Sequence, residues 1–271
     1  MAKTVLITGA SRGIGRAAAE YFSSRGWNVA ASMRNPENWK GPGKTANTRV
    51  YRLDVTKPDT IDDTVKSVIK DYGRIDVLVN NAGYGVEGLL EAMTDDAIMK
   101  QFDTNVFGLM RVTRAVIPVM RTQMGGVIIQ VSSMAGRSAF PMYSVYNSTK
   151  WAVEGFTESL QYELSQFNIR LKLIEPGIVK TDFYGRSREF VKRDDLDMYG
   201  EFVPNVDDRS MAAGEKGEPP ERIAKAIYEA ATDGSGRFRY PAGSPAPMLL
   251  ALRRVMPERL FFRLIKQYYR I

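Results

Sequence analysis

The sequence predicts one α/β domain built on a doubly wound parallel sheet of about seven strands, with helices on both faces and a helical C-terminal tail. Three observations support this fold class. Short β-type runs alternate with longer helical patterns along most of the 271 residues. A glycine-rich turn follows the first of these runs. No repeat or low-complexity linker divides the chain, and a hydrophobic content of 44% is enough for a large core.

The expected strands are short runs rich in β-branched and aliphatic residues. They cover residues 4–8, 28–33, 48–53, 76–80, 126–132, 170–175 and 237–240. The expected helices lie between them, at residues 13–25, 58–72, 95–120, 146–167 and 219–232. This alternation makes neighbouring strands parallel, because each helix carries the chain back across the sheet.

Two segments fall outside the alternation. Residues 182–217 have mixed charge and scattered aromatics without a sustained period, so we expect a loop over the functional site. The Pro-rich residues 241–247 then separate the main domain, 1–247, from a basic and apolar C-terminal extension, 248–271.

Composition excludes several kinds of chemistry. The chain has no cysteine and no histidine, which rules out disulfides, thiolate chemistry, Cys/His zinc sites and triads with an imidazole base. Any acid/base catalyst must be Tyr, Lys, Asp or Glu, and we expect no metal site. The first residues lack the pattern of a secretory signal, and no apolar stretch approaches the ~20 residues that span a bilayer. We therefore expect a cytoplasmic protein.

The net charge of +7 is concentrated in the extension. Residues 248–271 carry six basic side chains and one acidic one, which leaves +2 for the rest of the chain. A nearly balanced main domain does not present the basic face that nucleic acid requires. We expect no nucleic-acid partner.

The turn after the first strand has the sequence Thr8-Gly9-Ala10-Ser11-Arg12-Gly13-Ile14-Gly15 and opens the first helix. Glycines there let the backbone approach a pyrophosphate, and the helix N-terminus directs N–H groups and its dipole at it. A tight turn that needs glycine for its own geometry is the alternative, but the position after an N-terminal strand favours phosphate binding. The expected cofactor contacts in the turn are Gly9, Ser11, Arg12, Gly13, Ile14 and Gly15.

The end of the second strand indicates which nicotinamide cofactor is preferred. It has the sequence Ser32-Met33-Arg34, without the acid that binds the ribose 2′-hydroxyl of NAD. Arg12 in the turn is a second cation on the same side. Either arginine alone is equally compatible with a solvated surface position, but both together, with the acid missing, favour NADP(H) over NAD(H).

These and later motifs resemble the short-chain dehydrogenase/reductase family. They occur in the family's order between residues 4 and 240: Thr8 to Gly15 (TGxxxGxG), Leu53-Asp54-Val55, Asn80-Asn81-Ala82-Gly83, Asn105, Val131-Ser132-Ser133, Tyr146 to Lys150 (YxxxK), and Pro176-Gly177 with Thr181. The resemblance implies a Rossmann-type oxidoreductase, a homodimer or homotetramer, that transfers hydride between NADPH and a carbonyl or secondary alcohol. It covers neither the extension nor the details of the segment from residue 182.

Tyr146 and Lys150 are four residues apart on an expected helix, which places both side chains on one face. A tyrosine pKa near ~10 is too high for an efficient base at neutral pH, and an adjacent ammonium group favours the phenolate. In a chain without histidine, this pair is the best candidate for proton transfer, with Tyr146 as general acid/base. A packed tyrosine and a surface lysine at a helix start are the alternative, which the phosphate-binding turn disfavours.

The resemblance implies two further catalytic residues. Ser133 is expected to hydrogen-bond the substrate oxygen as charge develops, and Ser132 is the competing candidate at the same strand end. Asn105 is expected to hold a water that relays protons to Lys150. A mid-helix asparagine that faces solvent is the alternative for Asn105.

The resemblance also assigns the rest of the cofactor site. The expected contacts beyond the turn are Arg34, Asp54, Val55, Asn81, Ala82, Gly83, Tyr146, Lys150, Pro176, Gly177, Val179 and Thr181. An apolar and aromatic set is expected to face the substrate, which favours a lipophilic ketone, aldehyde or secondary alcohol. This set is Met134, Phe140, Met142, Tyr143, Phe183 and Tyr184.

Beyond Pro257 the extension is expected to form an amphipathic basic helix, because apolar residues recur at helical spacing. The apolar positions are Leu260, Phe261, Leu264, Ile265 and Tyr268. The helix either docks on this subunit or its partner, closing the site or the oligomer, or lies on an anionic membrane surface; docking is the usual role of such helices in globular proteins. A non-catalytic NADPH-binding regulator and a membrane-surface association protein remain as alternative functions.

Overall fold

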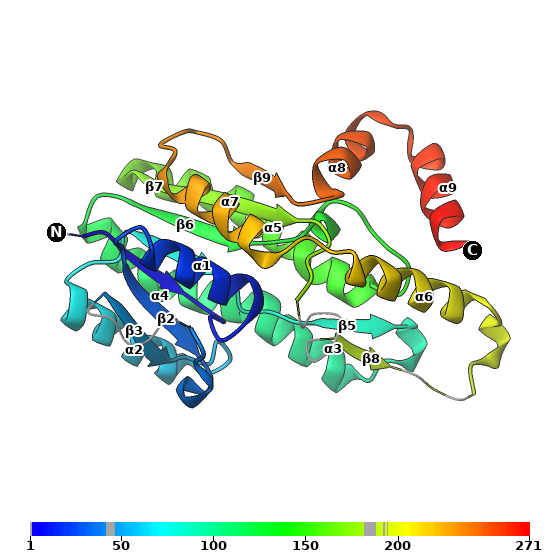
Figure 1. Cartoon of the computed structure of the whole chain (residues 1–271), viewed down its shortest axis with the longest axis horizontal. Coiled ribbons are helices and arrows are strands. Elements are labelled where there is room, and N and C mark those ends of the chain that lie inside the picture. Colours follow the sequence, from blue (N-terminus) through cyan, green and yellow to red (C-terminus); the bar gives the residue numbers. More distant parts are fainter. Residues whose placement is uncertain (1, 42–46, 182–187, 192, 194) are drawn as a thin grey trace.

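The computed structural model describes residues 2–41, 47–181, 188–191, 193 and 195–271. Its centre is a parallel seven-stranded sheet with the order β3-β2-β1-β4-β6-β7-β9 (Figure 1). The strands are β1 (Thr4–Ile7), β2 (Asn28–Met33), β3 (Thr48–Arg52), β4 (Val77–Asn80), β6 (Gly126–Val131), β7 (Ile169–Pro176) and β9 (Arg239–Ala242). The predicted doubly wound sheet is confirmed.

Helices cover both faces of this sheet. One layer contains α1 (Gly13–Ser23) and α7 (Pro220–Thr232), and the other contains α2 (Pro58–Tyr72), α4 (Leu109–Thr122) and α5 (Ser144–Leu164). Alternate residues of each strand supply the two cores. Val5 and Ile7 pack into the core with α1 and α7, whereas Leu6 between them packs into the opposite core. Both faces of a strand are therefore apolar, as a parallel sheet covered on both sides requires.

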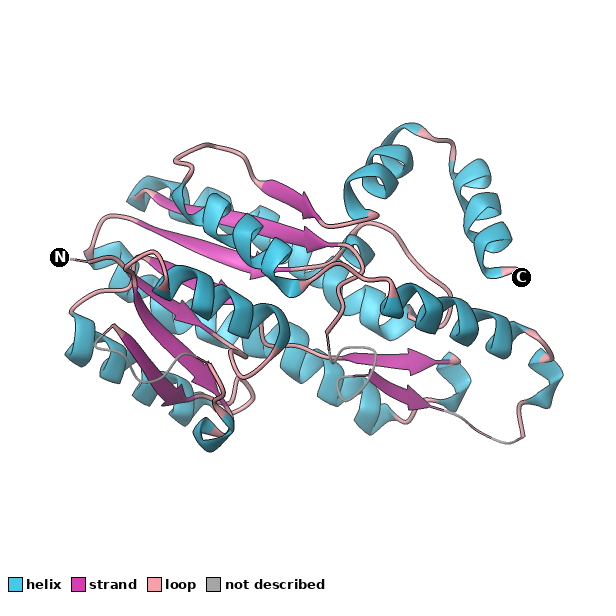
Figure 2. Ribbon diagram, viewed as in Figure 1, coloured by secondary structure: helices cyan, strands magenta, loops and turns pink. Residues whose placement is uncertain are grey.

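The expected loop at residues 182–217 is corrected by the structure. Its described part contains β8 (Arg188–Val191) and α6 (Phe202–Glu215), and β8 pairs in parallel with β5 (Gly85–Gly88) beside the main sheet (Figure 2). The buried side of α6 is small and partly polar, which explains why the sequence shows no sustained hydrophobic period there. Buried ionic contacts join these elements instead: Arg188 on β8 pairs with Glu87 on β5 at 2.5 Å and with Asp207 on α6.

The long helix expected at residues 95–120 is also corrected. It consists of α3 (Asp95–Phe102), a π-helical segment (Asp103–Gly108) and α4. Within the π-helical segment, Asn105 hydrogen-bonds the backbone of Tyr84 through both ends of its amide, at 2.8 and 3.1 Å. A π-helical turn inserts an extra residue into the helix, and such turns are frequent at functional sites.

The C-terminal tail is helical, as predicted. It forms α8 (Ala246–Val255), for which no separate helix was expected, and α9 (Glu258–Tyr269), which begins directly after Pro257. Both lie at the same end of the molecule as β5, β8 and α6 (Figure 2). None of the helices in the described ranges is long and apolar enough to cross a membrane.

The tail packs on its own subunit. Phe261 and Tyr269 on α9 are only 2% and 7% exposed, and Tyr269 shares an apolar cluster with Met142 and with Val206 on α6. The amide of Asn205 donates to the carbonyl oxygen of Arg270 at 3.2 Å. In this structure the tail is therefore docked on its own subunit, which is the first of the two expected arrangements.

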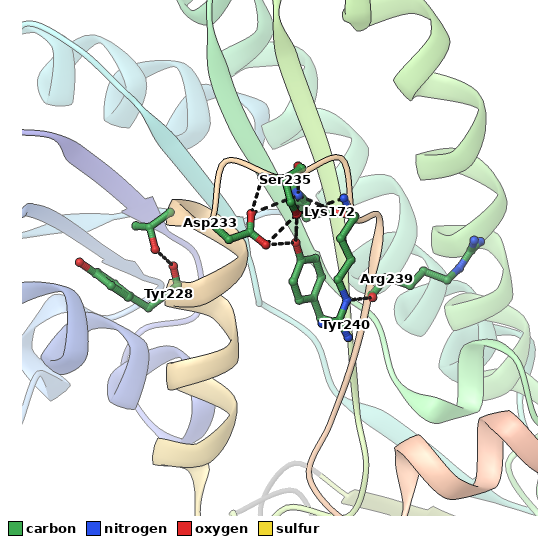
Figure 3. Close-up of polar contacts among 8 residues, drawn as sticks. Lys172, Tyr228, Asp233, Ser235, Arg239 and Tyr240 are labelled. Carbon is green, nitrogen blue, oxygen red and sulfur yellow. Dashed lines mark hydrogen bonds and ion pairs between the residues drawn. The ribbon is translucent and has the colours of Figure 1, made fainter.

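Lys172 on β7 holds the loop between α7 and β9 in place through hydrogen bonds (Figure 3). Its ammonium group donates to the carbonyl oxygens of Ser235 and Arg237 at 2.7 Å and to the Tyr240 hydroxyl at 2.9 Å. Asp233 lies 3.5 Å away as a counter-ion. This buried lysine is thus held by polar groups on several sides.

The other helices among the described residues are single turns of 3₁₀ type. They are Pro36–Asn38, Leu90–Ala92, Met134–Gly136, Ser165–Phe167 and Asp197–Tyr199.

Candidate active site

A cavity of about 1080 Å³ opens at the carboxyl ends of the central strands. This is where open parallel sheets bind ligands, because the chain leaves neighbouring strands in different directions there. The turn after β1 and the ends of β2, β4, β6 and β7 form one side, and residues of α6, α8 and α9 form the other. The cavity thus joins the expected phosphate-binding turn to the C-terminal tail.

The glycine-rich turn has the geometry that a phosphate requires. Gly9 and Gly13 have φ angles of +65° and +53°, the left-handed region that glycine adopts without strain. A Cβ at Gly9 would lie 2.9 Å from the Cα of Ala82. The Thr8 hydroxyl accepts the backbone N–H groups of Asn81 and Ala82 at 3.0 and 3.1 Å, which braces the turn against the end of β4. The Arg12 side chain does not cap α1, so the first N–H groups of the helix suit an anion.

Gly15 has a packing role in this structure. It is buried within α1 and does not line the cavity. A Cβ there would overlap the Asn81 side chain and the Gly9 carbonyl group. Its contribution to the expected cofactor site is therefore the close approach of helix to strand.

The structure brings most of the predicted site residues together on the wall of this one cavity. The predicted residues that line it are Gly9, Ser11, Arg12, Gly13, Ile14, Arg34, Asp54, Val55, Asn81, Ala82, Gly83, Ser133, Met134, Phe140, Tyr143, Tyr146, Lys150, Pro176, Gly177, Val179 and Thr181. Gly15, Asn105 and Met142 do not line it. Phe183 and Tyr184 lie outside the described residues.

Met142 corrects the predicted substrate set. Its side chain is 7% exposed and packs with Val206 and Tyr269 instead of facing the cavity. Its φ is +62°, and its carbonyl oxygen accepts the backbone N–H of Gly88 at 2.9 Å. Met142 thus has a left-handed backbone conformation, and its side chain packs against α6 and α9.

Tyr146 and Lys150 both project from α5. The Lys150 ammonium group donates to the carbonyl oxygen of Val131, at the end of β6, at 2.9 Å, and lies 5.8 Å from the centre of the Tyr146 ring. Ser133 follows the same strand, and its hydroxyl interacts with Tyr146. One helix and one strand end therefore position all three side chains.

Burial dominates the acid/base properties of this pair. It raises the pKa of Tyr146 to about 12, against a smaller lowering by the Ser133 hydroxyl. Burial lowers the pKa of Lys150 to about 8, against a raising effect of Glu154. The pKa of Tyr146 is therefore raised, and not lowered as expected, because removing the phenol from water disfavours its charged form.

The two candidate serines have different surroundings. Ser133 contacts Tyr146, and its oxygen accepts the backbone N–H of Ala135 at 3.1 Å. Ser132 is 3% exposed and interacts with Glu154, whose pKa it lowers. This geometry favours Ser133 as the serine that faces a substrate oxygen next to Tyr146.

Asn105 is 2% exposed, which excludes the solvent-facing alternative. Besides Tyr84, its amide donates to the Thr149 hydroxyl on α5 at 3.2 Å. Thr149 immediately precedes Lys150. Asn105 therefore fastens the π-helical segment to α5 behind the cavity.

Sequence reasoning missed a group of tail residues that line the cavity. They are Met248, Leu249, Leu252, Phe261, Leu264, Ile265, Tyr268 and Tyr269. The apolar spacing of α9 was visible in the sequence, but nothing in the sequence alone shows which surface those side chains cover.

The basic end of the cavity lies at β2 and the turn. Arg12 and Arg34 both line it. The nearby acid Asp54 accepts the backbone N–H and the hydroxyl of Thr56 at 3.0 and 2.8 Å through the same carboxylate oxygen. Arg12 and Arg34 thus lie on the cavity wall at the glycine-rich turn and the end of β2.

Comparison with known proteins agrees with this geometry. The model of the short chain dehydrogenase family matches residues 3–192. A 3-ketodihydrosphingosine reductase from Bacteroides thetaiotaomicron is 32% identical, with 98% of each chain covered. A solved short-chain dehydrogenase from Streptomyces avermitilis superposes with a TM-score of 0.81, at 31% identity over 98% of each chain. The solved structure of ElxO with NADP bound has a TM-score of 0.72, at 27% identity over 89% of this chain and 98% of that one.

Proposed function

This chain belongs to the short chain dehydrogenase family and is an oxidoreductase, and we propose that it reduces a lipophilic carbonyl compound with NADPH, using Tyr146 as the proton donor. One observation carries the proposal. The Ser133, Tyr146 and Lys150 side chains line the same cavity as the glycine-rich turn and the apolar tail. The groups that would bind a cofactor, donate a proton and contact an apolar substrate thus line one cavity.

The described residues fit a nicotinamide dinucleotide. The left-handed glycines and the uncapped start of α1 suit its pyrophosphate, and no side chain larger than hydrogen is tolerated at Gly9. When bound, NADPH supplies the hydride. Its nicotinamide end would lie near Pro176, Gly177 and Thr181, which line the cavity beside Tyr146.

The acid/base state of Tyr146 favours reduction. With a pKa of about 12 the phenol carries its proton at neutral pH, which is the form that protonates an alkoxide oxygen. As hydride reaches the carbonyl carbon, the developing charge on oxygen accepts hydrogen bonds from Ser133 and Tyr146, and the Tyr146 proton moves to that oxygen. The charged Lys150 stabilises the phenolate that remains until a proton returns.

The preference for NADPH rests on Arg12 and Arg34. An arginine paired with the 2′-phosphate forms charge-assisted hydrogen bonds that NADH does not offer. Both arginines line the basic end of the cavity, and Asp54 is engaged with Thr56.

The lipophilic substrate rests on the lining of the opposite end. Met134, Phe140 and Tyr143 line the cavity there, and Leu252, Phe261 and Ile265 of the tail line it as well. Such walls contribute affinity through apolar contact area. The Bacteroides relative is a 3-ketodihydrosphingosine reductase, which supports a long apolar substrate.

We also propose a cytoplasmic homo-oligomer. Phe107, Trp151 and Tyr162 are 43%, 49% and 73% exposed, and the latter two lie on α5. A shallow groove between α4 and α5, lined by Phe156 and Leu160, continues this surface. A second copy of the chain covers such a face in an isologous dimer, and sedimentation of Trp151→Glu against the native chain tests it.

The function is tested with a panel of ketones and aldehydes of increasing apolar length, following NADPH absorbance. We expect turnover to increase with apolar length, NADPH to bind more tightly than NADH, and Arg34→Asp to reverse or remove that preference. Arg254→Asp, an equally charge-changing substitution outside the cavity lining, is the control. Tight NADPH binding with no turnover on any carbonyl class would favour the non-catalytic regulator instead.

A further inference from the structure

Two glutamates are buried directly behind the proposed catalytic lysine. Glu154 lies one helical turn beyond Lys150 on α5 and is 5% exposed. Glu175, near the end of β7, is fully buried. Buried carboxylates are costly unless other groups compensate their charge, so their surroundings need an explanation.

Two arginines hold the glutamates in place. Arg239 on β9 donates to Glu154 at 3.0 Å and lies 3.6 Å from Glu175. Arg137, which follows β6, donates to Glu175 at 3.3 Å. The other end of the Arg239 guanidinium binds Glu158, an exposed residue one further turn along α5, at 2.7 Å. Arg239 therefore links the buried Glu154 to the exposed Glu158.

One oxygen of each glutamate is left without a hydrogen-bond partner among the described residues. These atoms are Oε1 of Glu154 and Oε2 of Glu175; the Ser132 hydroxyl is close enough to Glu154 to lower its pKa but does not meet the geometry of a full hydrogen bond. A Cβ at Gly136 would lie 2.6 Å from the Ser132 hydroxyl and 3.2 Å from Oε1 of Glu154. Glycine at position 136 thus leaves room for these polar atoms between α5 and the segment that follows β6.

The charges in this cluster act on one another. Burial raises the pKa of Glu154, and it raises the pKa of Glu175 to about 7, with a further contribution from the charge of Glu154. Glu154 in turn raises the pKa of Lys150, opposing the effect of burial.

We propose that Glu154 is a positioning residue of the reaction: its carboxylate, held by Arg239 one turn from Lys150, keeps the Lys150 ammonium group charged beside Tyr146. This inference rests on the proposed function. Glu175 shares Arg239 with Glu154, so the two carboxylates titrate as a coupled pair.

The polar and charged groups around Lys150 and Glu154 come from several elements of the described structure. They are Tyr146 and Glu158 on α5, Ser132, Ser133 and Arg137 after β6, Glu175 on β7 and Arg239 on β9. Glu154 is the carboxylate in this set whose charge acts most directly on Lys150.

The test follows the charge of Lys150 itself, by NMR of protein labelled with ¹³C at lysine Cε and titrated with pH. Lys150→Arg identifies its signal. In Glu154→Gln, which keeps the shape and one acceptor for Arg239, the Lys150 titration should move down by about one pH unit, the scale of a neighbouring charge. Glu158→Gln removes the exposed partner of the same arginine and should leave the Lys150 titration in place. The Lys172 signal serves as an internal reference in both variants.

The readout does not depend on the substrate, so it separates this inference from the proposed function. If the Lys150 titration moves down in Glu154→Gln as expected but no carbonyl compound is turned over, the charge effect stands and the proposed function is rejected. An active enzyme whose Lys150 titration is the same in both variants would reject the role of Glu154. If the enzyme is active, kcat should fall as the pH rises and Lys150 loses its proton. This fall should begin at a lower pH in Glu154→Gln than in Glu158→Gln.

If Glu154→Gln does not fold, Glu154→Asp gives the same answer. This variant keeps the carboxylate, but its side chain is shorter by one methylene, so the charge lies farther from Lys150. Lys150 should therefore titrate at a lower pH than in the native chain. Identical titration in Glu154→Asp and the native chain contradicts the proposal.

Discussion

The molecule buries two lysines in two different ways. Lys172 is 1% exposed, and its ammonium group has two backbone acceptors, a hydroxyl and a counter-ion within 3.5 Å. Lys150 is 9% exposed, and among the described residues its ammonium group has one hydrogen-bond acceptor, the carbonyl oxygen of Val131. Burial lowers the pKa of both lysines, so burial alone does not mark a functional lysine.

The two lysines differ in how many hydrogen-bond donors of the ammonium group are still available and in whether the ammonium group reaches a cavity. An ammonium group has three protons to donate. The partners of Lys172 use that capacity to hold a loop, as Figure 3 shows. Lys150 lines the cavity and keeps donors available for a cofactor ribose or a phenolate. The comparison predicts that one lysine governs turnover and the other governs stability.

The largest expected effect is on Lys150→Met. Removing the ammonium group should lower kcat about 10³-fold, in the range of a lost acid/base contribution, because the Tyr146 phenolate loses its counter-charge. The midpoint of thermal unfolding should change little, because Lys150 makes few bonds. Steady-state kinetics and a melting curve on the same preparation measure both. An unchanged kcat in Lys150→Met would contradict the role of Lys150 in turnover.

The opposite pattern is expected for Lys172→Met. Loss of one member of a buried polar cluster should destabilise the protein by about 3 kcal/mol, because Asp233 and the loop carbonyls lose their donor. At a temperature where the variant is folded, its kcat should stay within about twofold of the native value, since Lys172 lies outside the cavity lining. Urea unfolding gives the free energy. A stable but inactive variant would mean that the two lysines do not divide their roles.

A smaller effect is expected for Asp233→Asn and depends on pH. Although burial raises the pKa of Asp233, hydrogen bonds from Tyr240 and Ser235 lower it overall to about 2. A carboxylate whose pKa is lower in the folded state contributes stability above its unfolded pKa and loses it as the pH falls through about 2. Native protein should therefore exceed Asp233→Asn in urea midpoint at pH 6 by more than at pH 2. Equal differences at the two pH values would show that the Asp233 charge is not used.

The same two lysines show how far sequence reasoning reaches. Tyr146 and Lys150 were predicted because their spacing, the glycine-rich turn and the absence of histidine all converge on one chemistry. Lys172 carries no such pattern, because its partners come from a loop far along the chain. The seven strands of the main sheet were predicted from apolar runs, since both faces of that sheet are buried.

The elements that sequence reasoning missed depend on tertiary contacts. The strands β5 and β8 are four residues each and are joined by the buried Glu87–Arg188 pair, which has no local pattern. The π-helical segment forms around the bonds of Asn105 to Tyr84. Phe261 was placed correctly on an apolar helix face, but its position on the cavity wall depends on where α6 and α8 lie.

The most direct test of the central claim, that Tyr146 delivers the proton, is a single-turnover measurement on Tyr146→Phe. The variant is mixed with saturating NADPH and a reactive apolar ketone, and NADPH absorbance is followed after its binding has been confirmed by fluorescence titration. We expect nearly unchanged NADPH affinity and a hydride-transfer rate lower by about 10³-fold, because the alkoxide lacks its proton donor. Hydride transfer at the native rate in Tyr146→Phe, with the cofactor bound, would contradict the role of Tyr146 as proton donor.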